Sequence, residues 1–134
     1  MKKVYLAGAV DGLSREQARG WRKKAAEKLR KANLIIIDPT LVVNPNITHK
    51  AGDVVYKCFQ GVADADILLV EMSKNNYGYI GTATEMCWAW AQRKPIIVWG
   101  QANRQSYFLK YYASKMFGTL DEALVHIIDQ EGQA

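Results

Sequence analysis

The stretch Val4-Tyr5-Leu6-Ala7-Gly8-Ala9-Val10 decides the fold that the sequence predicts. Its first residues are uniformly apolar, which is typical of a strand covered on both faces of a sheet. A glycine turn and a helical pattern follow it directly. Further apolar runs, rich in Val and Ile, occupy residues 34–37, 67–70 and 96–99, and a weaker one lies at 116–117.

Helical patterns alternate with these runs along the whole chain, at residues 14–32, 54–63, 82–93, 104–114 and 120–130. Alternation of strand and helix implies right-handed crossovers and helices on both faces of a parallel sheet. We therefore expect one α/β domain over residues 1–134, a doubly wound, flavodoxin- or Rossmann-like sandwich with strand order 2-1-3-4-5.

Composition narrows the class of protein. The 134 residues are 49% hydrophobic, enough for one core, and no apolar run is long enough to span a membrane. The apolar N-terminus is interrupted by Asp11 and favours a buried strand over a secretory leader. Cys58 and Cys87 lack metal or redox spacing. These features predict a cytoplasmic protein with reduced thiols and without a metal or cofactor.

The net charge of +5 raises the question of a nucleic-acid partner. Much of the excess lies in the helix expected at residues 14–32, at Arg15, Arg19, Arg22, Lys23, Lys24, Lys28, Arg30 and Lys31. We interpret it as a solvated helix face, with weak attraction for anions as the alternative. No nucleic-acid-binding motif accompanies it, so no nucleic-acid partner is expected.

Three expected helix starts carry a hydroxyl residue followed three positions later by Glu or Gln, the signature of a capping box. The pairs are Ser14 with Gln17, Thr82 with Glu85, and Thr119 with Glu122. Between the second strand and the second helix, Asn44-Pro45-Asn46 predicts a turn within an irregular loop that extends to Gly52.

Ligands of open parallel sheets bind beyond the carboxyl ends of the strands, so the loops there carry the chemistry. The loop Gly8–Gly12 is neither a P-loop nor a dinucleotide fingerprint. The loop before Gly81 and Thr82 is more informative, because its glycines let backbone amides approach a ligand. Glu85 is then expected in the first helical turn, where the dipole keeps a carboxylate ionised.

An ionised carboxylate at this position can capture the oxocarbenium-like state of glycosidic cleavage. Tyr5, on the first strand, can orient it. Both residues also have purely structural explanations: Glu85 as a capping residue and Tyr5 as a core side chain.

Several elements together resemble the nucleoside 2-deoxyribosyltransferase family, which includes related deoxynucleotide N-hydrolases. They are Tyr5-Leu6-Ala7-Gly8, Ala65-Asp66, Gly81-Thr82-Ala83-Thr84-Glu85, Lys94-Pro95-Ile96-Ile97-Val98 and Leu120-Asp121-Glu122-Ala123-Leu124. The resemblance implies that Glu85 attacks the anomeric carbon and Tyr5 orients it. A second base or water then accepts the deoxyribosyl group. It also implies a site completed by a neighbouring subunit, hence a homodimer or larger homo-oligomer.

The loops and the resemblance together supply a set of expected substrate-binding residues: Gly8, Ala9, Asp11, Gly12, Asp38, Asp66, Tyr79, Gly81, Thr82 and Ser106. The chain departs from the family pattern at Ala9, Cys58 and Tyr79, so the identity of the base stays open. Ala9 and Asp11 replace the residues with which the hydrolases hold a 5′-phosphate. This substitution favours an unphosphorylated nucleoside, unless Arg22 or Ser106 supplies the contact.

Other functions remain compatible with the residues. They are a nucleoside 5′-monophosphate N-glycosidase, a phosphoribohydrolase of the type that acts on cytokinin nucleotides, and a non-catalytic nucleotide-binding module. A receiver-like domain is disfavoured, because Glu71 follows the third strand without an acidic pair after the first.

Overall fold

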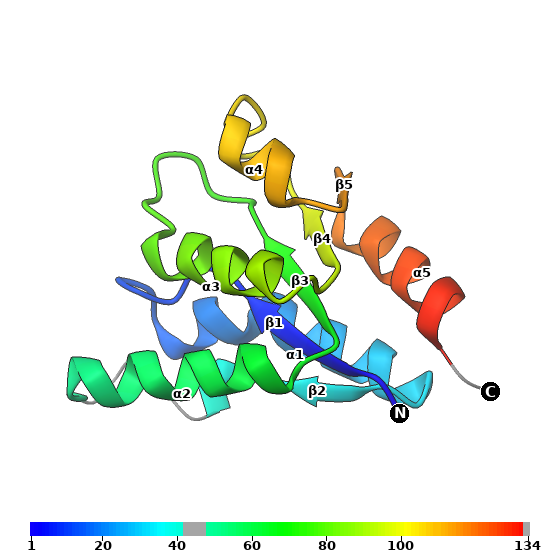
Figure 1. Cartoon of the computed structure of the whole chain (residues 1–134), viewed down its shortest axis with the longest axis horizontal. Helices are drawn as coiled ribbons and strands as arrows, with labels where there is room; N and C mark the ends of the chain where they lie inside the picture. The colour runs from blue at the N-terminus through cyan, green and yellow to red at the C-terminus, as the bar shows by residue number, and fades with distance from the viewer. Residues whose placement is uncertain (42–47, 133–134) are drawn as a thin grey trace.

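The computed structural model describes residues 1–41 and 48–132 and contains a five-stranded parallel sheet (Figure 1). The strands are β1 (Lys3–Ala7), β2 (Ile35–Ile37), β3 (Ile67–Glu71), β4 (Ile96–Trp99) and β5 (Lys115–Phe117). Their order, β2-β1-β3-β4-β5, confirms the predicted topology and places β1 and β3 side by side at its centre.

Helices cover both faces of the sheet. One face packs against α1 (Arg15–Lys31) and α5 (Leu120–Glu131), and the other against α2 (Ala51–Asp64), α3 (Ile80–Ala91) and α4 (Tyr107–Tyr112). A short 3-10 helix, η1 (Pro39–Leu41), follows β2. Figure 1 shows α2, α3 and α4 together on the near side of the sheet, with α1 behind it.

Alternation along β1 decides which side chains reach which layer, because successive strand residues point to opposite faces. Val4 and Leu6 join the core beneath α1 and α5, whereas Tyr5 and Ala7 join the core beneath α2, α3 and α4. Tyr5 therefore lies on the side of the sheet that carries α3.

Several element boundaries differ from the expectations. β1 ends at Ala7, so Gly8 to Val10 belong to the loop after it. The second helix begins at Ala51, earlier than expected, and α4 is a shorter helix than the pattern suggested. The turn predicted at Asn44-Pro45-Asn46 lies outside the described residues.

Two of the three predicted helix caps are found. Ser14 and Gln17 form a complete capping box at the start of α1. At α5 the Thr119 side chain accepts a hydrogen bond from the Glu122 backbone N–H.

The capping box predicted for Thr82 and Glu85 is wrong. Tyr79, in the left-handed conformation with φ of 50°, immediately precedes α3, and the helix begins at Ile80. Thr82 is therefore a buried residue inside the first turn, and Glu85 is the sixth residue of the helix. Because Glu85 lies in the second turn, its expected proximity to the helix N-terminus is also wrong.

The basic face of α1 is solvated in part. Lys23, Lys24 and Lys28 are exposed, but Arg22 is completely buried. Arg22 shares its helix face with Ala18, Ala25 and Leu29, so its spacing is that of a core residue. Among the described helices, none is long and apolar enough to cross a membrane.

Candidate active site

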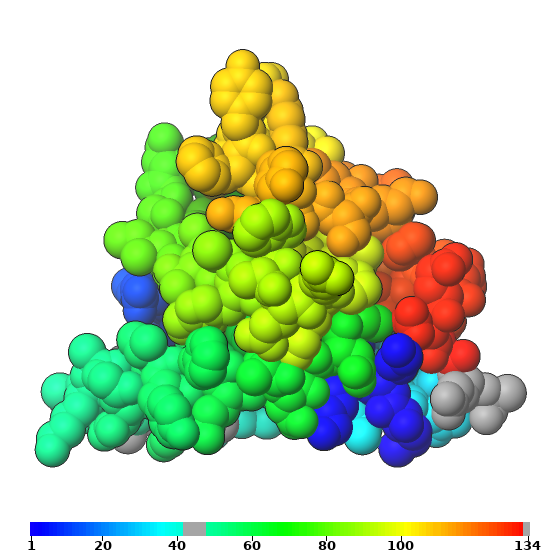
Figure 2. All heavy atoms as spheres, viewed as in Figure 1, coloured from blue at the N-terminus to red at the C-terminus, as the bar shows by residue number. Residues whose placement is uncertain are grey.

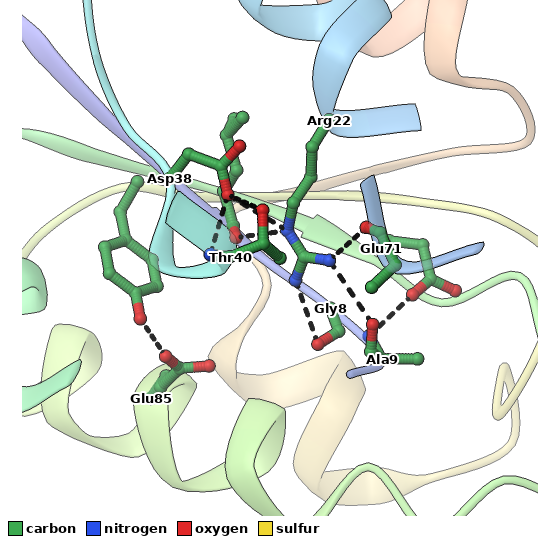
Figure 3. Close-up of polar contacts among 10 residues, drawn as sticks. Gly8, Ala9, Arg22, Asp38, Thr40, Glu71 and Glu85 are labelled. Atoms are coloured by element: carbon green, nitrogen blue, oxygen red, sulfur yellow. Dashed lines mark hydrogen bonds and ion pairs between the residues drawn. The ribbon is translucent and has the colours of Figure 1, made fainter. Parts of the chain in front are cut away.

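The central pair of the site joins β1 to α3. The Tyr5 hydroxyl donates a hydrogen bond to Oε2 of Glu85, which is labelled in Figure 3. Both side chains are buried. Gly61 of α2 makes room for the phenol, because a Cβ at this position would lie 2.7 Å from the Tyr5 ring. The structure thus brings together the two residues that the sequence assigned to catalysis.

Burial controls the ionisation of Glu85. It raises the pKa of this carboxyl to about 7, although the Tyr5 hydrogen bond, the charge of Arg22 and the Cys58 thiol oppose the rise. Burial also raises the pKa of Tyr5, which stays a hydrogen-bond donor. The sequence-based expectation that a helix dipole keeps Glu85 fully ionised is therefore wrong, because desolvation outweighs the favourable contacts.

Glu85 lies in the wall of a cavity of about 500 Å³ at the carboxyl ends of the central strands. The loop after β1 forms one side, and residues 77–79 with the first turns of α3 form another. Val54, Val55 and Cys58 of α2 complete the wall. A cavity of this size accommodates a nucleoside-sized ligand.

Aromatic side chains supply much of this wall. Tyr77 and Tyr79 pack edge to face with ring centroids 4.8 Å apart, and Trp88 contributes from α3. The Tyr79 hydroxyl is already engaged, since it donates to Glu71 Oε2 and accepts from the Lys74 N–H. The Tyr79 hydroxyl therefore holds the loop, while its buried ring packs against Tyr77.

Glu71, the last residue of β3, anchors two loops from beneath. Its Oε1 accepts the Ala9 N–H at 2.9 Å. Its Oε2 accepts the N–H and hydroxyl of Ser73 and the hydroxyl of Tyr79, at 2.7, 2.7 and 2.5 Å. Burial raises the pKa of Glu71, but these hydrogen bonds outweigh it and hold the pKa below its usual value.

Arg22 forms a second buried anchor next to it (Figure 3). Its guanidinium donates to four backbone carbonyls, those of Leu6, Gly8, Ala9 and Ala18, at 2.6 to 3.3 Å. Its Nε lies 3.9 Å from Asp38 Oδ1. Two buried side chains thus hold the loop after β1. Arg22 binds the carbonyls of Gly8 and Ala9, and Glu71 binds the N–H of Ala9.

The expected substrate-binding residues divide into two groups. Those that line the cavity are Gly8, Ala9, Asp11, Tyr79, Gly81 and Thr82. Four others do not line it. Asp66 lies at the opposite, amino-terminal edge of the sheet, where its Oδ2 accepts the Lys3 N–H. Ser106 caps α4, Asp38 accepts hydrogen bonds from Thr40 behind the wall, and Gly12 forms a left-handed turn with φ of 77°.

Sequence reasoning missed the roles of Arg22 and Glu71. A signal existed for each residue. Arg22 falls on the apolar spacing of α1, and Glu71 ends a fully apolar strand, so both positions predict burial. A charged residue at a buried position requires compensating partners, which here are the loops of the cavity.

Residues 4–132 match the model of the family described as nucleoside 2-deoxyribosyltransferase. None of the curated protein sequences compared with the chain matches it significantly.

Three solved structures show the same fold at low sequence identity. A 2-deoxyribosyltransferase from Leishmania mexicana aligns with a TM-score of 0.75 and 15% identity, over 98% of this chain and 99% of that one. A 2-deoxyribosyltransferase from Bacillus psychrosaccharolyticus gives 0.73 and 20%, over 91% and 90%. A CMP N-glycosidase from Clostridium botulinum gives 0.68 and 15%, over 96% and 99%.

Proposed function

The chain belongs to the nucleoside 2-deoxyribosyltransferase family, and from this premise we propose that it cleaves the N-glycosidic bond of a deoxynucleoside with Glu85 as covalent nucleophile. The observation that carries the proposal is the pair of Tyr5 and Glu85. A carboxylate fixed by a buried phenol opens onto a cavity of suitable size and aromatic character.

The proposed reaction has two steps. A Glu85 carboxylate oxygen attacks the anomeric carbon while the bond to the base breaks, and the electron pair of that bond leaves with the base, which takes up a proton. In the second step a free nucleobase or water attacks the same carbon and loses a proton to solvent. The bond from that carbon to the Glu85 oxygen breaks, and its electron pair returns to the carboxylate. Transfer and hydrolysis share the first step, so the site supports either outcome.

The Tyr5 hydrogen bond orients the nucleophile and stabilises its negative charge before attack. Because only the ionised carboxylate attacks, the reaction requires the deprotonated form of Glu85. A pKa of about 7 means that the share of this form rises through the neutral range. We expect the rate of cleavage to rise with pH on the same limb.

The charges of the cavity favour a substrate without a 5′-phosphate. Asp11 is exposed at the cavity, whereas the guanidinium of Arg22 is bound to backbone carbonyls and completely buried. Tyr77 and Trp88, which are half-buried in the cavity wall, offer apolar surface to the base. A nucleoside 5′-monophosphate is the alternative substrate, and the similarity in fold to a CMP N-glycosidase motivates testing it.

We further propose that a second copy of the chain covers the face formed by α2, α3 and α4, which points toward the viewer in Figure 2. Large apolar side chains are exposed there on all three helices: Val55, Tyr56, Phe59, Ile80, Trp90, Tyr107, Phe108 and Tyr111. Val55 and Ile80 also line the cavity, so a partner on this face would close its mouth.

Light scattering of the wild type and of Phe108→Glu tests this assembly. We expect a dimer or larger species for the wild type and a monomer with reduced turnover for the variant. A wild type that is monomeric at micromolar concentration contradicts the shared site.

Glu85→Gln tests the nucleophile, because Gln preserves the shape of the side chain but cannot form the ester to the sugar. We expect a loss of turnover of at least about three orders of magnitude, the scale on which losing a nucleophile is felt. The substrates are a panel of nucleosides and 5′-monophosphates, with and without free adenine or cytosine, and the products are separated by chromatography.

The matched control is Glu122→Gln, the same chemical change at an exposed position of α5. It should retain full turnover. A well-folded Glu85→Gln variant with near-normal cleavage overturns the covalent mechanism. Binding of nucleosides by the wild type without any cleavage indicates a non-catalytic binding module instead.

A further inference from the structure

Arg22 is the one arginine of α1 that is completely buried, and its surroundings are unusual for a cation. Four neutral carbonyl oxygens receive its N–H groups, from Leu6, Gly8, Ala9 and Ala18. Carbonyls solvate a guanidinium but do not cancel its charge, and a guanidinium stays protonated in proteins. A full positive charge therefore lies beneath the loop after β1.

The carboxylates around this charge only partly neutralise it. In the part of the chain that the structure describes, its one ion pair is with Asp38, at 3.9 Å. The Asp38 Oδ1 atom also accepts hydrogen bonds from the N–H and hydroxyl of Thr40. Glu71 is engaged by Ala9, Ser73 and Tyr79. Arg22 and Glu85 both line the same cavity, so the charge that Asp38 leaves uncompensated can act on Glu85.

Three titratable or charged groups, each from a different element, act on Glu85. They are Tyr5 from β1, Arg22 from α1 and Cys58 from α2, with Asp38 and Glu71 around Arg22 on its other sides. Of these groups, Arg22 is the cation. Burial favours protonation of Glu85. The Tyr5 hydrogen bond opposes it first and the charge of Arg22 second, so that the pKa of Glu85 settles at about 7.

We propose that Arg22 is a positioning residue that acts on Glu85 through its charge and on the loop after β1 through its carbonyl contacts. The charge holds Glu85 in the anionic form that attacks the substrate. The hydrogen bonds fix Gly8 and Ala9, which line the cavity. This inference rests on the proposed nucleophilic role of Glu85.

The pH dependence of kcat/KM separates the two tasks. Arg22→Met removes the charge and the donors while keeping a long side chain. Arg22→Lys keeps a charge but cannot reach four carbonyls. Lys23→Met is the matched control, because it removes one exposed positive charge from the next position of the same helix.

For the wild type we expect an acid limb near pH 7. Arg22→Met should move this limb upward by about one pH unit or more, the usual effect of losing a neighbouring opposite charge. Arg22→Lys should leave the limb in place and raise KM, and Lys23→Met should change neither. An Arg22→Met limb that coincides with the wild type overturns the proposal.

Melting temperatures between pH 4.5 and 8 give a second readout that needs no turnover. A higher Glu85 pKa in Arg22→Met should extend the pH range over which stability falls. If Arg22→Met does not fold, the pH profile of Arg22→Lys decides. This variant retains the positive charge, so an acid limb of kcat/KM that is displaced by a full pH unit overturns the role of the charge. Failure of the nucleophile is distinguishable, because it appears as an active Glu85→Gln.

Discussion

Glu71 and Glu85 are both buried glutamates at the same end of the sheet, yet their carboxyls are in opposite states. Glu71 is 1% exposed and Glu85 is 7% exposed. The pKa of Glu71 lies below its usual value, whereas that of Glu85 is raised to about 7. Loss of water alone therefore does not decide the charge of either group.

The difference lies in the hydrogen-bond donors. Glu71 receives four hydrogen bonds, two of them from backbone N–H groups of neighbouring loops. Glu85 receives a hydrogen bond from Tyr5, and the charge of Arg22 and the thiol of Cys58 add smaller effects. A fully satisfied carboxylate serves as an anchor, while a partly satisfied one facing a cavity keeps the capacity to react.

The largest effect on stability is expected from Glu71→Gln. The Ala9 N–H and the Ser73 N–H point at opposite oxygens of Glu71, so one of them must face the new amide NH2. We expect a loss of about 4 kcal/mol in the free energy of unfolding, because charged hydrogen bonds disappear and a buried donor is left unsatisfied. Urea unfolding measures it.

Glu122→Gln, at an exposed position, is the control for this change and should alter stability by less than about 0.5 kcal/mol. If Glu71→Gln lowers the free energy of unfolding no more than its control does, Glu71 does not anchor the loops. The proposed difference between Glu71 and Glu85 is then wrong.

The fold and the contact between Tyr5 and Glu85 were predictable, because the residues that indicate them lie in short stretches of sequence. Apolar runs alternating with helical spacing predicted the strand order, and the motif around Glu85 pointed to the pair with Tyr5. The ionisation of Glu85 was not predictable. It depends on Arg22 and Cys58, which are distant in sequence, and on a helix start shifted by Tyr79.

Asp66 and Ser106 show the opposite limit of sequence reasoning. Both residues flank strands, as site residues do, but Asp66 precedes β3 and lies at the wrong edge of the sheet. Ser106 follows β4 and caps a helix. The positions of such residues become clear only when the direction of each strand and the paths of the loops are known.

Stability should fall as pH rises from about 4.5 to about 7. Glu85 binds its proton more tightly in the folded chain than in the unfolded one, so its contribution is complete below pH 4.5 and disappears above pH 7. The shift from 4.5 to about 7 corresponds to about 3 kcal/mol. Thermal or urea unfolding of the wild type and of Glu85→Gln, compared across this range, isolates the contribution.

Glu85→Gln has no proton to lose, so its profile should lack this component. Glu71 has the opposite effect on stability at lower pH. Because its pKa is lower in the folded chain than in the unfolded one, its contribution is complete above the unfolded pKa and is lost as the pH falls. Equal slopes for the wild type and Glu85→Gln between pH 5 and 7 would show that Glu85 titrates normally.

Tyr5→Phe removes the hydroxyl that donates a hydrogen bond to Glu85, so Glu85 is even less stabilised as an anion than Glu71 is. We expect kcat/KM near pH 7 to fall about 30-fold, equivalent to about 2 kcal/mol, the value of a hydrogen bond to a charged group. The acid limb of the pH profile should also move upward. Tyr112→Phe, in α4 and outside the cavity wall, is the control and should leave kcat/KM unchanged.

Raising the pH distinguishes the two parts of the Tyr5 effect. Activity of Tyr5→Phe that recovers fully at high pH means that Tyr5 acts through ionisation alone. A constant deficit at all pH values means that it acts through orientation, and an undiminished kcat/KM removes Tyr5 from the site.

The smallest expected effect is on the preference between nucleosides and their 5′-monophosphates, which depends on the charges at the cavity that Glu85 faces. The Ala9 N–H is occupied by Glu71, and Arg22 is bound to carbonyls, so neither is free to grip a 5′-phosphate. The exposed Asp11 carboxylate would repel one. We expect deoxynucleosides to have a kcat/KM about tenfold above that of their 5′-monophosphates, or about 1.4 kcal/mol, a magnitude typical of one poorly screened like-charge contact.

Asp11→Asn should narrow this difference in kcat/KM, and added salt should narrow it in the wild type by screening Asp11. Asp53→Asn, an exposed aspartate of α2 outside the cavity wall, should leave it intact. A 5′-monophosphate that reacts faster than its nucleoside would mean that a phosphate grip exists elsewhere in the assembled protein.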